Sequence, residues 1–144
     1  MKKQSLGILT CISALGLMTA CGSTRDVALT GTVTADAAVS SGPVRIEFFE
    51  HTGSSDQTSP AKPNADLKFV EAIPLEALGK FSHTVSIDGD KVHLIAFIDV
   101  NKDDKCTDGE AWGESDVAIQ SDDTASATVN IVAQAACPAV PAAN

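Results

Sequence analysis

The sequence has no tyrosine, one tryptophan and five phenylalanines among its 144 residues. Aromatic rings offer large stacking surfaces to ligands, and a small domain needs most of its phenylalanines for its core. A glycan-binding or other small-ligand domain is therefore the less favoured alternative. Basic residues are also scarce, with 10 Lys and Arg against 19 Asp and Glu. This balance argues against nucleic acid as a partner and against a polybasic attachment to anionic lipid, because both need clustered positive charge.

Long apolar runs are lacking too. The run "LGILTCISALGLM" (6–18) is too short to span a bilayer with ease. It follows the basic start "MKK" and precedes the small residues "TAC", an order typical of a secretory signal.

The ending "LMTAC" (17–21) resembles the lipobox of bacterial lipoproteins. The resemblance implies that residues 1–20 are a cleaved signal peptide and that Cys21 is lipidated, which anchors the chain in a membrane. Gly22 after the cysteine implies the outer membrane if the host is Gram-negative. The alternatives are a soluble secreted protein with Cys21 as a free thiol, or a single uncleaved membrane helix.

The mature chain would have 124 residues, enough for one domain. Without Lys2 and Lys3, 8 basic residues remain against 19 acidic ones, a formal charge of −11. Residues 21–26 would form a short tether that holds the domain against its membrane, and residues 138–144 a disordered tail. Cys106 and Cys137 remain as a pair, which in an exported protein favours a disulfide over zinc ligation.

The mature sequence consists of short alternating segments separated by turn residues, which predicts an all-β fold. We expect seven strands, at 27–35, 44–50, 67–73, 80–87, 91–98, 117–119 and 126–132. This number and spacing favour a β-sandwich over residues 27–137, with a small closed barrel as the alternative. Residues 51–66 are predicted to form a long surface loop, and the segment 91–98, apolar on both faces, a central strand. The layout of the first strand followed by "SGPVRIEFFE" resembles transthyretin-like, immunoglobulin-like or carboxypeptidase-regulatory-like sandwiches of exported bacterial proteins.

The segment "DVNKDDKCTDGE" (99–110) holds five acidic side chains, one amide and one cysteine. Its oxygen-bearing side chains recur at every second position, with a carboxylate at the end. The segment resembles the calcium loop of EF-hands, borne here on a β-domain. The resemblance implies that Asp99, Asn101, Asp103 and Glu110 bind Ca²⁺ through side-chain oxygens and Lys105 through its backbone carbonyl.

This segment differs from the EF-hand pattern at its sixth position, where Asp104 replaces the usual glycine. Aspartate tolerates the left-handed backbone conformation needed there better than most residues, so we expect only a reduced affinity. The alternative is that the acidic side chains simply spread into solvent, where their repulsion is screened.

No nucleophile elbow or catalytic triad pattern is present. If segments 80–87 and 91–98 form a hairpin, His83 and His93 lie on opposite faces, which argues against a joint zinc site. We therefore expect a non-catalytic protein that acts as a structural or protein-binding module of the cell envelope, with an unidentified envelope protein as its possible partner. A hydrolase accessory domain is a less favoured alternative.

Overall fold

A computed structural model of the chain describes residues 24–39, 41–52, 66–133 and 136–138. The predicted signal peptide, Cys21, most of the 51–66 loop and most of the tail therefore lie outside the described residues. Seven strands are present: β1 (Arg25–Ala35), β2 (Val44–His51), β3 (Leu67–Leu75), β4 (Gly79–Ile87), β5 (Lys91–Ile98), β6 (Trp112–Ala118) and β7 (Thr124–Ile131). Within the described part of the chain, no helix is long and apolar enough to cross a membrane.

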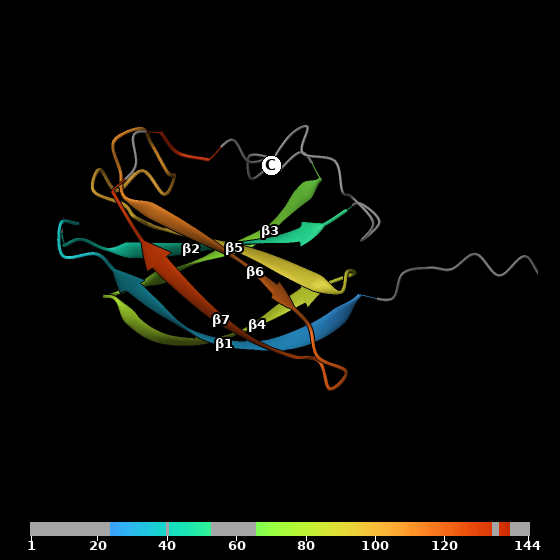
Figure 1. The fold of residues 1–144 in the computed structure, drawn as a ribbon. Helices are drawn as coiled ribbons and strands as arrows, with labels where there is room; N and C mark the ends of the chain where they lie inside the picture. Colours follow the sequence, from blue (N-terminus) through green and yellow to red (C-terminus); the bar gives the residue numbers. More distant parts are fainter. Residues whose placement is uncertain (1–23, 40, 53–65, 134–135, 139–144) are drawn as a thin grey trace, which may run out of the picture.

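The strands form two sheets that pack face to face (Figure 1). One sheet has the order β4-β1-β7, in which β1 pairs antiparallel with β4 and parallel with β7. The other has the order β3-β2-β5-β6 and is antiparallel throughout. A bridge between Trp112 and Val132 joins the two sheets on the β6 and β7 side. The predicted all-β, seven-stranded sandwich is confirmed.

The core lies between the sheets and follows from the alternation of each strand. In β7, for example, every second residue is buried and the others are exposed. The largest side chains that the two sheets bury between them include Leu29, Phe48, Ile87, Leu94 and Ile131. Burial of such side chains stabilises each by roughly 1.5–3 kcal/mol relative to exposure, so this core supplies the main driving force for folding.

The outer face of the four-stranded sheet carries a second apolar cluster. It consists of Phe49, Leu67, Ile95, Phe97 and Trp112, with Phe69, Cys106 and Cys137 packed against them. This cluster explains why β5 is apolar on both faces, as a central strand should be, and the structure indeed places β5 between β2 and β6. The Trp112 indole Nε1 donates a hydrogen bond to the carbonyl of Ala136, 2.8 Å away.

Several predicted strands differ from the structure in their bounds; β3 extends to Leu75, for example, and β7 covers Thr124–Ile131. The sixth strand begins at Trp112 rather than at residue 117, because β6 continues through Gly113. A Cβ at this position would lie 2.1 Å from the carbonyl oxygen of Asn130 in β7, so glycine is needed for the close approach of the two strands. The first strand begins at Arg25, two residues earlier than predicted.

The predicted hairpin of 80–87 and 91–98 is wrong. The short turn between β4 and β5 passes from one sheet to the other, so the two strands are not paired. Strands of both sheets hold this turn: the Asp88 amide donates to Glu50 Oε2 at 3.0 Å, and Arg25 Nη2 donates to the carbonyl of Gly89 at 2.9 Å. Because His83 and His93 lie in different sheets, a β4–β5 pairing does not determine the faces on which they lie.

Candidate metal centre

The acidic loop 99–110 connects β5 to β6 at one end of the sandwich, opposite the end where β1 begins (Figure 1). Its two ends are fixed to the sheet. The amide of Asp99 donates to the carbonyl of Pro43 at 3.0 Å, and the amide of Ile98 to that of Ala111 at 2.9 Å. The loop is therefore held where it leaves and rejoins the core.

Asp99 begins the loop and is only 6% exposed. Its two carboxylate oxygens accept hydrogen bonds from the backbone amides of Asp103 at 3.2 Å and Asp104 at 3.1 Å. Asp104 has φ of 63°, the left-handed conformation expected at the sixth position of the loop. A buried carboxylate thus bends the following five residues around itself, because charge-assisted hydrogen bonds to backbone amides are strong.

Glu110 ends the loop and is only 5% exposed. One carboxylate oxygen accepts from the amides of Val100 at 2.8 Å and Asn101 at 3.4 Å, and the other from the amide of Thr107 at 3.0 Å. The last side chain of the loop is therefore bonded to both the first residues and the middle of the loop, and it closes the loop on itself.

The intermediate ligand candidates are exposed to solvent but ordered by local hydrogen bonds. Asn101 Oδ1 accepts from the amide of Asp103 at 3.1 Å, and Asp103 Oδ1 accepts from the amide of Lys105 at 3.0 Å. Asn101 Nδ2 donates to Asp103 Oδ2 at 3.1 Å. These bonds order the side chains of Asn101 and Asp103 within the loop but do not bring the acids of the loop to one centre.

The donor set of the loop is carboxylate, amide and carbonyl oxygen, which suits a hard cation such as Ca²⁺. In this structure the carboxylate oxygens of Asp99, Asp103 and Glu110 accept hydrogen bonds from different backbone amides of the loop. Calcium binding would therefore require the carboxylates to move together and exchange part of these hydrogen bonds for the ion. Arg45 Nη1 already neutralises one acid of the loop, at 2.6 Å from Asp104 Oδ1.

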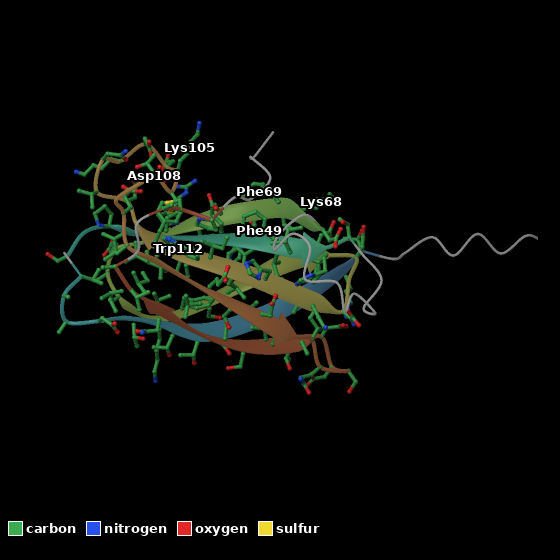
Figure 2. All side chains as sticks on the ribbon, turned by 45° about the horizontal axis from the view of Figure 1, so that its top comes forward. Phe49, Lys68, Phe69, Lys105, Asp108 and Trp112 are labelled. Carbon is green, nitrogen blue, oxygen red and sulfur yellow. A yellow bond between two sulfur atoms is a disulfide. The ribbon has the colours of Figure 1, made fainter. Side chains whose placement is uncertain are left out.

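A disulfide joins Cys106 in the loop to Cys137 beyond β7, with 5.8 Å between the two Cα atoms. The predicted disulfide is thus present, and zinc ligation by this pair is not. Next to it, the amide of Cys137 donates to Asp108 Oδ1 at 3.3 Å. Figure 2 shows Lys105 and Asp108 at the loop, at the same end of the molecule as Trp112. The cross-link spans 31 residues and contributes about 3–4 kcal/mol of stability in the chain-entropy model.

A second cluster of polar residues lies on the outer face of the four-stranded sheet, and the sequence reasoning did not find it. His51 Nε2 and His93 Nδ1 both lie 2.9 Å from Asp116 Oδ1. In the described residues, these three side chains place their ligand atoms within 4.8 Å of one another. They come from three neighbouring strands, β2, β5 and β6, and His93 is directly opposite Asp116 in the register of β5 and β6.

The pKa of the Asp116 carboxyl is affected by opposing causes. Partial burial acts to raise it, but hydrogen bonds from His93 and His51, and the charges of both rings, together lower it below the ordinary value of 3.8. The carboxylate is therefore ionised at neutral pH and available to a cation.

The cluster could not be predicted from a hairpin of segments 80–87 and 91–98, because that pairing omits the true neighbours of β5. With β5 placed between β2 and β6, strand alternation alone brings His51, His93 and Asp116 to one face. His83 lies elsewhere: its ring stacks on Phe48 at 5.4 Å between ring centroids, and its Nε2 lies 3.1 Å from Glu71 Oε1 in β3. The expected separation of His83 from His93 therefore holds, although for a different reason.

Comparisons with known proteins identify no family. No family model matches the chain, and no curated protein matches it. Among solved structures, a double mutant of the shaft pilin SpaA from Lactobacillus rhamnosus GG is similar, with 9% sequence identity and a TM-score of 0.34. The match covers 78% of this chain and 52% of the pilin chain, so this chain spans about half the length of that structure.

Proposed function

We propose that the protein is a lipid-anchored, non-catalytic β-sandwich of the cell envelope, in which a structural calcium ion in loop 99–110 rigidifies one end of the domain. In this role it acts as a structural or protein-binding module. The single observation that carries the proposal is the construction of the loop, in which two buried carboxylates, Asp99 and Glu110, organise the backbone around the expected ligand positions.

The position of the loop supports a role away from the membrane. The lipobox-like Cys21 precedes the first strand by four residues, and β1 begins at the end of the sandwich opposite the loop (Figure 1). The strand β5 joins these two ends over eight residues, about 25 Å at roughly 3.3 Å per residue. An anchor at Cys21 would therefore hold the loop at the distal end of the domain, where it is accessible to a partner in the envelope.

The negative charge of the loop supports a bound calcium ion in addition to the hydrogen-bonded turn. Two acidic residues with under a tenth of their surface exposed stand at its two ends, and Asp103, Asp104 and Asp108 lie between them. Like charges about 5 Å apart repel by roughly 3 kcal/mol per pair at an effective dielectric constant near 20. A divalent cation at their centre removes this repulsion, and the affinity should lie in the micromolar to millimolar range of extracellular modules.

The partners of the buried acids support a non-catalytic role. Glu50 Oε1 accepts from Lys68 Nζ at 2.6 Å and its Oε2 from the Asp88 amide, so this acid fixes the turn between β4 and β5. Asp99 and Glu110 are occupied by the loop backbone in the same way. These carboxylates stabilise structure and leave little capacity for acid–base chemistry.

The anchor is tested by labelling with palmitate and by fractionation of cells that express the full chain or a C21S variant. We expect label and membrane association for the full chain and neither for the variant. Equal fractionation of the two would refute the anchor.

The partner role is tested by cross-linking in intact envelopes, followed by purification of the protein in detergent, with calcium or with a chelator. Two variants are compared: E110Q, which changes a ligand candidate, and D108N, which removes one charge from the same loop at a position that is not a ligand. A partner captured with calcium, retained by D108N and lost by E110Q supports the proposal. Capture that ignores both calcium and E110Q would refute the role of the loop.

A further inference from the structure

The cluster of His51, His93 and Asp116 has no role in the function proposed above. It lies on β2, β5 and β6, near the end of the sandwich where β1 begins, and it shares no residue with loop 99–110. We propose that these three side chains form a binding site for one divalent transition-metal ion, Zn²⁺ or Cu²⁺, separate from the calcium loop.

The hydrogen bonding of His93 provides the first argument. The side chain is only 6% exposed, its Nδ1 lies 2.9 Å from Asp116 Oδ1, and its Nε2 is buried without a hydrogen-bond partner among the described residues. If the neutral ring donates from Nδ1 to Asp116, the lone pair of Nε2 is left buried and unpaired. That lone pair then faces a carboxylate oxygen of Glu114 at 3.5 Å, which is an acceptor as well. An unmatched buried polar atom destabilises the folded state, because it has lost its hydrogen bonds to water.

Either a second proton on the ring or a metal ion on Nδ1 removes this mismatch. With the metal on Nδ1, the ring proton moves to Nε2 and points at Glu114, which can then accept it. Donation of the second ring N–H to a carboxylate is the common arrangement for a metal-bound histidine, because it fixes the tautomer and makes the ligand more basic. We assign Glu114 this positioning role and the other three residues the role of ligands.

The donor geometry provides the second argument. Asp116 Oδ1 lies 2.9 Å from a nitrogen of each imidazole, and all three ligand atoms lie within 4.8 Å of one another. An ion with bonds of about 2.0–2.2 Å to nitrogen and oxygen needs ligand atoms roughly 3–3.5 Å apart, so small side-chain movements suffice. Two imidazoles with one carboxylate favour zinc or copper over calcium and magnesium, which prefer oxygen ligands throughout.

Among the described residues, the surroundings leave one side of the site open. The buried ring of His93 packs edge-on against Phe49, with 6.1 Å between ring centroids, and against His51 at 6.2 Å. The side chain of Asp116, in contrast, is 60% exposed. The strands therefore hold three ligands on one side of the ion, and a fourth position faces solvent, where water or an exogenous ligand can bind.

The test uses the full chain purified in detergent, stripped with a chelator and then dialysed into buffer with excess calcium. The calcium occupies the proposed site in the acidic loop, so that added zinc does not bind there. Isothermal titration with Zn²⁺ should show one site per chain with a dissociation constant in the micromolar range or below. H51A and D116N should each weaken binding at least 100-fold. H83A removes a histidine outside the cluster and should bind zinc like the unmodified chain.

Two further measurements make the result independent of folding defects. The far-UV circular dichroism of each variant is compared with that of the unmodified chain, and only folded variants are scored. The electron paramagnetic resonance spectrum of the Cu²⁺ form should show two equatorial nitrogen ligands, reduced to one in H51A. Absence of zinc binding in the folded chain, or binding that H51A and D116N leave unchanged, would overturn the proposal and indicate a metal-free ion pair.

The two metal proposals can fail separately. E110Q should leave zinc affinity unchanged, because Glu110 lies in the loop at the other end of β5. A loss of zinc binding in E110Q, with H51A unaffected, would place the zinc in the acidic loop and refute the assignment to the histidine cluster.

Discussion

Calcium should raise the melting temperature of this protein, and substitution of Glu110 should remove most of this increase. Glu110 is nearly inaccessible and accepts three backbone N–H bonds with its two carboxylate oxygens. In E110Q one of those oxygens becomes an NH₂ group, which cannot accept a bond from an amide. The variant therefore loses at least one charge-assisted hydrogen bond even without calcium.

The expected change in the free energy of unfolding has two parts. A hydrogen bond to a charged group contributes about 1.5–3 kcal/mol, so E110Q should be less stable than the unmodified chain by about 2 kcal/mol in chelator. Calcium at 100 times its dissociation constant adds roughly 2.7 kcal/mol to the unmodified chain. For a domain of this size, 1 kcal/mol corresponds to roughly 3–5 °C, so calcium should raise the melting temperature by about 10 °C.

The assay is thermal unfolding followed by circular dichroism, at a series of calcium concentrations and in excess chelator. Magnesium at the same concentrations controls for general screening of charge. D108N is the matched variant, because it removes a negative charge from the loop but not from a ligand position. We expect D108N to keep the calcium response and E110Q to lose it. Melting curves of the unmodified chain that coincide in calcium and chelator would refute the calcium site.

Three further predictions concern stability. G113A should destabilise the domain by about 2–3 kcal/mol in urea unfolding, because its Cβ would lie 2.1 Å from the carbonyl oxygen of Asn130. G89A is the control and should change the stability little, because the nearest atom to its Cβ is 3.6 Å away. Equal effects of the two substitutions would contradict the packing argument. Burial raises the pKa of Glu47 above 4.5, and the positive charge of Arg45 partly opposes this shift. The charged form of Glu47 therefore destabilises the fold at neutral pH, and this destabilisation disappears as the pH falls toward 4.5. E47Q should therefore stabilise the protein at pH 7 but not at pH 4, and the exposed E76Q at neither, in urea unfolding at the two pH values. Reduction of the disulfide should lower the free energy of unfolding by about 3–4 kcal/mol and weaken calcium binding in titration calorimetry. Unchanged calcium affinity after reduction would show that the cross-link does not preorganise the loop.

The strands could be predicted because their alternation is local, whereas the sheet partners could not. Val27, Leu29 and Val33 repeat at even spacing and identify β1 without any knowledge of its neighbours. The Asp-Gly-Asp turn after β4, however, fits a hairpin as well as a crossing between sheets. The crossing is fixed by contacts distant in sequence, such as the bond from Asp88 to Glu50, and these carry no local signal.

The same distinction explains the two candidate sites. Loop 99–110 lies within one short segment, so the spacing of its acids is enough to name candidate ligands. Asp104 has the left-handed backbone expected at its place in that spacing, whereas the left-handed backbone of Lys102 was not expected. The histidine cluster combines β2, β5 and β6, so it exists only once the strand order is known. One signal was present in the sequence: His93 interrupts the apolar segment of β5, and a buried polar residue in a central strand requires a partner.

The two sites lie near opposite ends of the same three strands, and this arrangement has a mechanical consequence. The acidic loop joins β5 to β6 at one end, and the histidine cluster links β2, β5 and β6 near the other. A metal at the cluster would cross-link these strands close to the proposed anchor, while calcium and the disulfide would fix their distal end. Because side chains on adjacent strands act only through local contacts, occupancy of the two sites should add in stability rather than cooperate. Melting temperatures measured with calcium, with zinc and with both should therefore rise by independent increments, and a strong dependence of one increment on the other ion would show that the sheet transmits strain between its ends.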